Sequence, residues 1–134
     1  MEYERTLCVG DIHGNYPALM QALERAGCDY ERDRIISLGD IYDRHRKAAE
    51  CVEELVKFDN FVWVLGNHDE YVRRWFRGQW KAKKNAGKEE GRWLRRGGRD
   101  TVKSYCEDGK LRKKLFKKHA RLIEKAVLYF IDEH

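Results

Sequence analysis

The sequence lacks any run of apolar residues long enough to cross a membrane. Its longest apolar stretches, residues 61–65 and 126–131, fall far short of the roughly 20 residues that span a bilayer. The polar and acidic residues 1–6 do not resemble a signal peptide either. We therefore expect a soluble protein of the cytoplasm with no membrane partner.

The sequence also lacks paired cysteines, internal repeats and any linker between two domains. Its four cysteines are scattered without a CxxC pair: Cys8, Cys28, Cys51 and Cys106. This spacing favours reduced thiols over a disulfide framework or a zinc knuckle. A length of 134 residues with no linker predicts a single domain over residues 1–134.

The charged residues are plentiful but unevenly distributed. The composition is 42% hydrophobic and 38% charged, which excludes general disorder, and the formal net charge is +5. Lysine and arginine crowd residues 73–121, where they alternate with acids and do not frame an aromatic stacking platform. This pattern favours a solvated helical face over nucleic-acid binding. A positive surface would also draw a phosphorylated substrate toward an acidic site.

The order of apolar segments predicts an α/β fold. Residues 6–9, 34–38 and 61–65 form apolar runs without clean alternation, as expected of strands buried on both faces of a parallel sheet. Helical patterns separate them. One starts at Asn15 and Pro17 and stops at Gly27, and the other covers residues 47–57. The result is a β-α-β-α-β order with a parallel sheet and helices packed on it.

The second half of the chain predicts mainly helices. Residues 71–80 and 93–105 look helical, and the lysine-rich residues 81–91 between them look like a surface loop. Residues 111–123 form a basic amphipathic helix. A membrane or partner could bind it, but the commoner meaning is one core face and one wet face. Residues 126–131 predict a further strand.

Polar residues follow each of the first three predicted strands at once. They form three short motifs: Gly-Asp-Ile-His-Gly at 10–14, Gly-Asp-Ile-Tyr-Asp-Arg at 39–44 and Gly-Asn-His-Asp at 66–69. The carboxyl ends of parallel strands share one sheet edge, so we expect these loops to converge there. Oxygen and imidazole ligands without a thiolate suit manganese, iron, zinc or a similar divalent ion.

Each motif alone is weak evidence for a metal site. An isolated Asp-x-His is more often a capped turn, and Gly-Asn-His-Asp could be an ordinary turn. All three in order would crowd Asp11, Asp40 and Asp43 at one edge, where a cation would offset their repulsion. The set therefore predicts metal binding. Two ions roughly 3.5 to 4 Å apart could clamp a phosphate ester and generate hydroxide at neutral pH.

The motifs resemble those of the calcineurin-like metallophosphoesterases, and among these the bacterial and phage relatives of the serine/threonine phosphatases. That pattern is GDxHG, then GDxVDRG, then GNHE. Residues 96–98 (Arg-Gly-Gly), with Thr101, Ser104 and Tyr105, also look like the helical insert of that group. The resemblance runs from about residue 6 to residue 131. It implies the leading part of an αββα sandwich, with the C-terminal half missing from this chain.

The resemblance implies a dinuclear metal site. Asp11 and His13 would bind the first ion, Asp40 would bridge, and Asn67 would bind the second. Manganese is the ion that we expect, with iron, zinc or nickel as alternatives.

It also implies three catalytic residues. His68 would be the general acid, Asp43 would orient it, and Arg44 would hold phosphate oxygens. A metal-activated hydroxide would attack phosphorus in line, with no covalent enzyme intermediate.

The sequence departs from this pattern at three positions. Tyr42 stands for valine, His45 stands for glycine and is expected to crowd the phosphate-binding turn, and Asp69 stands for glutamate. Family members also continue into two later histidine segments that complete both metal positions. His119, on a predicted helix, and His134, at a predicted turn, are not credible substitutes.

Two functional classes stay open at this point. One is a phosphoric-ester hydrolase, impaired in this chain unless a longer chain or a partner completes its site. The other is a degenerate protein that binds metal or phosphate without turnover. Phosphoproteins, dinucleoside polyphosphates and small phosphate esters all remain candidate substrates. A sheet lacking its second half is also expected to expose an edge and an apolar face, which favours self-association.

Overall fold

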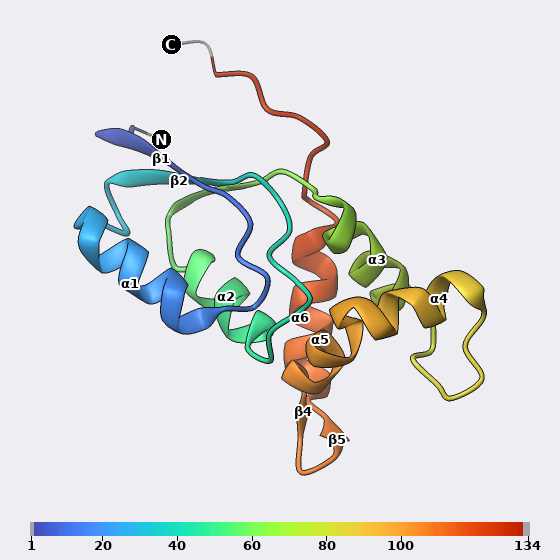
Figure 1. The fold of residues 1–134 in the computed structure, drawn as a ribbon. Coiled ribbons are helices and arrows are strands. Elements are labelled where there is room, and N and C mark those ends of the chain that lie inside the picture. The colour runs from blue at the N-terminus through green and yellow to red at the C-terminus, as the bar shows by residue number, and fades with distance from the viewer. Residues whose placement is uncertain (1, 133–134) are drawn as a thin grey trace.

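A three-stranded parallel sheet lies along one side of the fold (Figure 1). The computed structural model describes residues 2–132. Strands β1 (Arg5–Val9), β2 (Asp33–Ser37) and β3 (Asn60–Trp63) lie in the order β1-β2-β3. Every residue of the central strand β2 is buried. The predicted α/β fold with a parallel sheet is thus confirmed, and each strand lies within two residues of its predicted position.

Helices α1 (Tyr16–Ala26) and α2 (Ala48–Leu55) connect the strands and lie on the same side of the sheet (Figure 1). The Asn15 side chain caps α1 by accepting a hydrogen bond from the Ala18 N–H at 3.2 Å, and Gly27 ends it in a left-handed conformation. Leu19 and Leu23 of α1 are buried in the core together with the apolar face of α2. Both predicted crossover helices are confirmed.

The region after β3 is helical, with a small hairpin. It contains α3 (Asn67–Phe76), α4 (Lys88–Trp93), the π-helical turn η1 (Leu94–Gly98), α5 (Arg99–Ser104), β4 (Cys106–Glu107), β5 (Lys110–Leu111) and α6 (Lys113–Ile123). Helix α3 begins four residues earlier than predicted, so the motif at 66–69 forms its first turn. Helix α4 likewise begins inside the predicted loop.

Residues 93–104 are helical, as predicted, but they do not form one continuous helix, because the backbone breaks at Gly97. Gly97 has φ of +115°, and a Cβ atom there would lie 2.3 Å from the backbone nitrogen of Arg44. The Gly97 carbonyl instead accepts a hydrogen bond from that nitrogen at 3.3 Å. The break thus lets the helical region approach the loop that follows β2.

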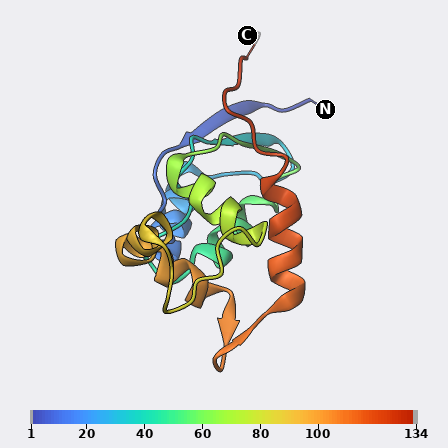
Figure 2. The same ribbon diagram turned by 90° about the vertical axis from the view of Figure 1, so that its right-hand side faces the viewer.

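An aromatic cluster docks α6 and Tyr105, the residue after α5, against α3, and Figure 2 shows α6 running alongside α3. Phe116 of α6 makes edge-on contacts with Trp75 and Phe76 of α3, with ring centroids 4.9 and 5.0 Å apart. Tyr105 contacts Phe76 at 5.4 Å. Such geometries stabilise a core beyond simple burial. The basic face of α6 stays exposed, which confirms one core face and one wet face.

The strand predicted for residues 126–131 is wrong. Within the described chain, only Val127 pairs with the sheet, through a single parallel bridge to Val64. After Val64 the chain that follows β3 runs through Gly66 into α3. It therefore offers no extended backbone with which residues after Val127 could pair. The next residues run on past the sheet without forming a strand (Figure 1), and Leu128 and Ile131 are 78% and 74% exposed. Arg34 of β2 still contacts the Phe130 ring and pairs with Asp132. The exposed apolar side chains of this region thus belong to the segment after α6, not to a strand of the sheet.

Helices long and apolar enough to span a bilayer are absent from residues 2–132. The four cysteines are all free, as predicted.

A buried chain of hydrogen bonds joins the loop after β2 to the protein surface. The Tyr42 and Tyr105 hydroxyl oxygens lie 2.8 Å apart. The Tyr105 hydroxyl contacts His119 Nδ1 at 2.6 Å, and His119 Nε2 contacts Glu53 at 2.6 Å. His119 is fully buried, and desolvation lowers its pKa although Glu53 opposes the shift. Both ring nitrogens are thus used structurally, and Tyr42 has a role that valine could not fill.

We predict that His119 makes the fold sensitive to mild acid. The unfolded chain takes up a proton near the ordinary histidine pKa of about 6.5, whereas the folded chain does so only at lower pH. Stability should therefore fall as pH drops below this value, by up to about 1.4 kcal/mol per pH unit. Glutamine can keep both hydrogen bonds without titrating. Urea unfolding between pH 7.5 and 5 should accordingly show a smaller slope for His119→Gln. An equal slope in both proteins would contradict the prediction.

Candidate active site

The loops after the three strands meet at the carboxyl edge of the sheet, as predicted. One potential ligand atom from each of Asp11, His13 and Asp40 lies within 4.8 Å of the others. Backbone hydrogen bonds tie the first two loops together, because the Ile12 and His13 N–H groups both donate to the Asp40 carbonyl, at 3.0 and 2.9 Å. The backbone thus holds Ile12 and His13 against Asp40, which follows them by 28 and 27 positions.

His13 is fixed in an orientation suited to binding a metal. It is buried, and its Nδ1 lies 2.8 Å from the Tyr42 carbonyl oxygen, to which a protonated Nδ1 donates. That hydrogen bond leaves the lone pair on Nε2, the atom that lies 3.7 Å from Asp11 Oδ2. The imidazole therefore presents its unprotonated nitrogen to the carboxylates.

Asn67 extends the cluster on the other side of Asp40. Its amide oxygen faces the Asp40 carboxylate, and turning the amide over would place its nitrogen 3.2 Å from Oδ2 and 3.3 Å from Oδ1. The His68 backbone N–H donates to Asp40 Oδ1 at 3.0 Å. Two oxygen ligands that face each other are compatible with a cation between them.

His68 and Asp43 form a hydrogen-bonded dyad beside this cluster. His68 Nδ1 lies 2.8 Å from Asp43 Oδ2, and this contact raises the pKa of His68 against the opposing effect of partial burial. Asp43 is fully buried and also accepts hydrogen bonds from the Trp93 indole at 2.9 Å and the Thr101 hydroxyl at 2.7 Å. Two residues of the helical region therefore orient the carboxylate that orients His68. Sequence reasoning missed Trp93.

Asp69 holds the second and third loops together through hydrogen bonds to their backbone. The sequence analysis identified this residue only as a departure from glutamate. Its fully buried carboxylate accepts five hydrogen bonds, four from backbone N–H groups and one from the Trp63 indole. The backbone donors are Asp40, Ile41, Tyr42 and Gly66. Burial raises the pKa of Asp69 to about 6 while these donors oppose the shift. An acid at the third position of a helix is a recognisable capping signal, which could have indicated this role.

Gly66 is required because two loops touch backbone to backbone. A Cβ atom there would lie 2.4 Å from the Asp40 nitrogen and 2.3 Å from its Oδ1. Any larger residue would push the third loop away from the second.

Backbone strain is concentrated at this site. His13, Asp40, Asp43 and Arg44 all have positive φ, between 48° and 77°. Such conformations cost about 1 kcal/mol or more each and persist where the surroundings hold them. The hydrogen bonds to Asp69 and between the loops supply that support.

Arg44 and His45 lie at the exposed edge of the site. Arg44 is exposed, although its charge lies near enough to lower the pKa of His68. His45 turns its Nδ1 toward the His13 carbonyl oxygen at 2.8 Å, and so braces the first loop. His119 is used in the core, as described above. His134 lies outside the described residues.

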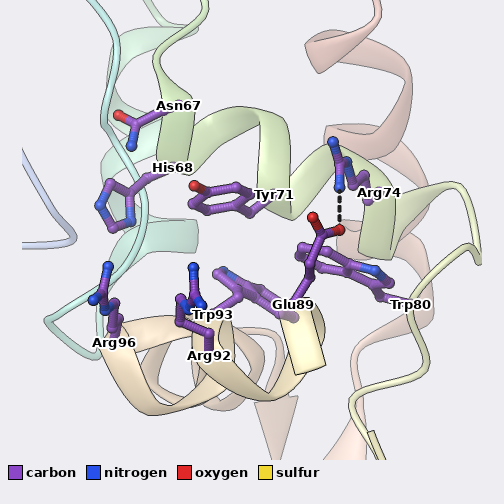
Figure 3. Close-up of a pocket in the computed structure, with 9 residues that line it drawn as sticks. All are labelled: Asn67, His68, Tyr71, Arg74, Trp80, Glu89, Arg92, Trp93 and Arg96. Carbon is purple, nitrogen blue, oxygen red and sulfur yellow. Dashed lines mark hydrogen bonds and ion pairs between the residues drawn. The ribbon is translucent and has the colours of Figure 1, made fainter. Parts of the chain in front are cut away.

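A pocket of about 290 Å³ opens directly beside His68 (Figure 3). Its lining comes from α3, the segment after it, α4 and η1. The residues are Asn67, His68, Tyr71, Arg74, Trp80, Glu89, Arg92, Trp93 and Arg96. The predicted surface loop therefore contributes to a concave site, which the sequence did not indicate.

The residues present fit a divalent metal ion. Two carboxylates and an oriented imidazole converge, the Asn67 amide is adjacent, and no thiolate belongs to the group. Without a cation, the clustered carboxylates would repel one another.

Comparison with known families agrees with this geometry. The model of the calcineurin-like phosphoesterases matches residues 4–132. The chain belongs to this family. A metallophosphoesterase from Sphaerobacter thermophilus has a similar fold, with a TM-score of 0.59 and 24% identity over 95% of this chain and 43% of that one.

Similar sequences include symmetrical bis(5'-nucleosyl)-tetraphosphatases. The protein of Coxiella burnetii is 34% identical over 73 residues, which cover 54% of this chain and 25% of that protein. That of Pseudomonas fluorescens is 35% identical over 81 residues, or 60% of this chain and 28% of that protein. The matched part of the chain thus spans about a quarter of the length of these relatives.

We predict that Asp69→Asn destabilises the fold by about 3 kcal/mol. The amide keeps the size of the carboxylate but turns an NH2 group toward N–H donors, and each buried donor left without an acceptor costs about 1–3 kcal/mol. Urea unfolding at pH 7.5 measures the change. Asp59→Asn is the control, because Asp59 is exposed. A loss no larger than that of the control would contradict the supporting role of Asp69.

Proposed function

We propose that this chain carries the metal-binding and acid–base residues of a metal-dependent phosphoric-ester hydrolase. The observation that supports it most is the position of the His68–Asp43 dyad beside the cluster of Asp11, His13 and Asp40. The His68 ring contacts the His13 ring edge-on, with centroids 5.0 Å apart. A proton donor and a set of metal ligands therefore adjoin the same space.

The metal ligands divide between two positions. Asp11, His13 and Asp40 would hold one divalent ion, and Asp40 with Asn67 would contribute to a second, with manganese as the expected ion. Bound ions would polarise the phosphate ester and supply a hydroxide nucleophile at neutral pH. The first position has three protein ligands here and the second has two, so the first should bind more tightly.

The other residues act on the substrate. His68 would donate a proton from Nε2 to the departing oxygen while Asp43 holds its Nδ1–H. Arg44, exposed at the rim, would hold phosphate oxygens by charge-assisted hydrogen bonds. Asp43 is itself held by Trp93 and Thr101, so its orientation does not depend on the substrate.

The relatives point to a substrate class. Their names specify bis(5'-nucleosyl) tetraphosphates, and we propose dinucleoside polyphosphates for this chain ahead of phosphoproteins and small phosphate esters. The competing proposal is a protein that binds metal or phosphate without turnover.

We predict that Asp40→Asn removes manganese binding more completely than His13→Ala. A bridging Asp40 carboxylate would serve both positions, whereas His13 would serve one. Equilibrium dialysis with manganese measures the bound ion per chain, and Asp59→Asn controls for the loss of a carboxylate elsewhere. Equal or greater retention of manganese by Asp40→Asn would argue against the bridging position.

We also predict that His68→Asn slows hydrolysis in proportion to how much the leaving group needs a proton. In the presence of manganese, the rate of phenyl phosphate hydrolysis should fall about 100-fold or more, which is within the usual range for the loss of a general acid. p-Nitrophenyl phosphate, whose leaving group is stable as an anion, should lose much less. Equal rate losses on the two substrates would contradict the role of His68 as the general acid. No turnover above that of manganese alone by the wild-type chain would favour the competing proposal.

A further inference from the structure

The pocket beside His68 lies on the side from which the proposed acid would protonate a leaving group. The His68 ring has His13 on one side and Tyr71 on another, with ring centroids 5.0 and 5.7 Å away. His13 belongs to the ligand cluster, whereas Tyr71 lines the pocket. A group leaving phosphorus toward His68 would thus enter this pocket.

Two arginines give the pocket a positive charge. Figure 3 shows the guanidinium groups of Arg92 and Arg96 turned toward the cavity from below, with Arg96 beneath His68. Neither side chain makes a hydrogen bond or ion pair with a residue of the described chain. Both are exposed, so their donors are available to an anionic ligand.

The third arginine of the pocket is already neutralised. Arg74 lies 3.4 Å from Glu89 and 3.8 Å from Glu70, and its guanidinium lies over the Trp80 ring at 5.2 Å. The Arg74–Glu89 pair lies on the side of the pocket away from His68 (Figure 3). The free positive charge is therefore concentrated near His68.

Aromatic rings form much of the remaining wall. Tyr71 and Trp80 are half-buried and stacked, with centroids 5.9 Å apart, and Trp80 packs on the buried Trp93 at 5.4 Å. Each ring is held by its neighbours, so the wall is already formed before a ligand arrives. Rigid aromatic walls of this kind favour a planar aromatic group.

We propose that this pocket is the leaving-group subsite of the proposed hydrolase and that it takes a nucleoside phosphate. Arg92 and Arg96 would bind its phosphate oxygens, and Tyr71 and Trp80 would contact its base. The assignment rests on the proposed function for its direction of cleavage. A phosphoserine peptide fits less well, because its leaving group is a neutral alcohol that uses neither the free guanidinium groups nor the rings.

The test is a binding measurement without metal. The 134-residue chain in EDTA is titrated calorimetrically with ADP, pyrophosphate and a phosphoserine peptide. ADP should bind at least tenfold more tightly than either of the other two, because it alone satisfies both the arginines and the rings. Equal affinity for pyrophosphate would show that charge alone is recognised, and equal affinity for the peptide would show that the wrong class was assigned. Either result, or no binding of ADP, overturns the proposal.

Matched variants locate the site. Arg92→Gln and Arg96→Gln combined should weaken ADP binding at least tenfold, whereas Arg95→Gln should not, because Arg95 is exposed on the same segment but does not line this pocket. Trp80→Leu should reduce the preference for ADP over pyrophosphate. A loss in Arg95→Gln equal to that of the double variant would overturn the assignment. The exposed arginines can be replaced without removing core contacts, and circular dichroism checks that each variant is folded.

These results are independent of catalysis. ADP binding that depends on Arg92 and Arg96 would stand even if manganese produced no turnover, in which case the proposed function alone would fail. Turnover without selective ADP binding would support the proposed hydrolase and contradict the proposed nucleotide subsite.

Discussion

The site depends on one buried carboxylate. Asp69 lies in the first turn of α3, yet four of its five hydrogen-bond donors are backbone N–H groups of the loops around it. Three of these donors belong to consecutive residues after β2, including Asp40, whose left-handed backbone would otherwise be unfavourable. The carboxylate therefore fixes the loop that carries Asp40 against the helix that carries Asn67 and His68. Asp69 thus fixes positions more than 25 residues apart relative to one another without itself being a proposed ligand.

The helical region supports the site through a second buried carboxylate. Asp43 accepts hydrogen bonds from His68, Trp93 and Thr101, so one residue joins the sheet loops to α4 and α5. Gly97 brings the same region onto the Arg44 backbone. The aromatic contacts of Phe116 and Tyr105 then fasten α6 behind it. Because Asp43 has no solvent contact, removing any of its three donors would leave a buried carboxyl group less well satisfied.

Local patterns in the sequence predicted what local physics determines. Buried parallel strands are apolar runs, and loops at their carboxyl ends must share an edge, so the positions of Asp11, His13 and Asp40 could be inferred from order alone. The contributions of Trp93 and of the pocket could not, because they depend on how α4 packs against the loop after β2. The prediction of a strand at 126–131 was wrong for a similar reason. An apolar run does not show whether a neighbouring strand is long enough to pair with it. The sequence does show a glycine at position 97, where the helix breaks. Only the structure shows the reason, which is that a side chain at this position would clash with the backbone of Arg44.

The two supports assign different tasks to different parts of the chain. The sheet loops, held by Asp69, present oxygen and imidazole ligands, which suits them to chemistry common to many phosphate esters. The helical region, held through Asp43, lines the space on the far side of His68 with arginines and aromatic rings, which in the proposed hydrolase would distinguish one leaving group from another. His68 lies at the junction, because its ring contacts both His13 and Tyr71. A change of α4 that preserved the hydrogen bonds of Trp93 and Thr101 to Asp43 could therefore alter selectivity while leaving the ligand cluster and the dyad in place.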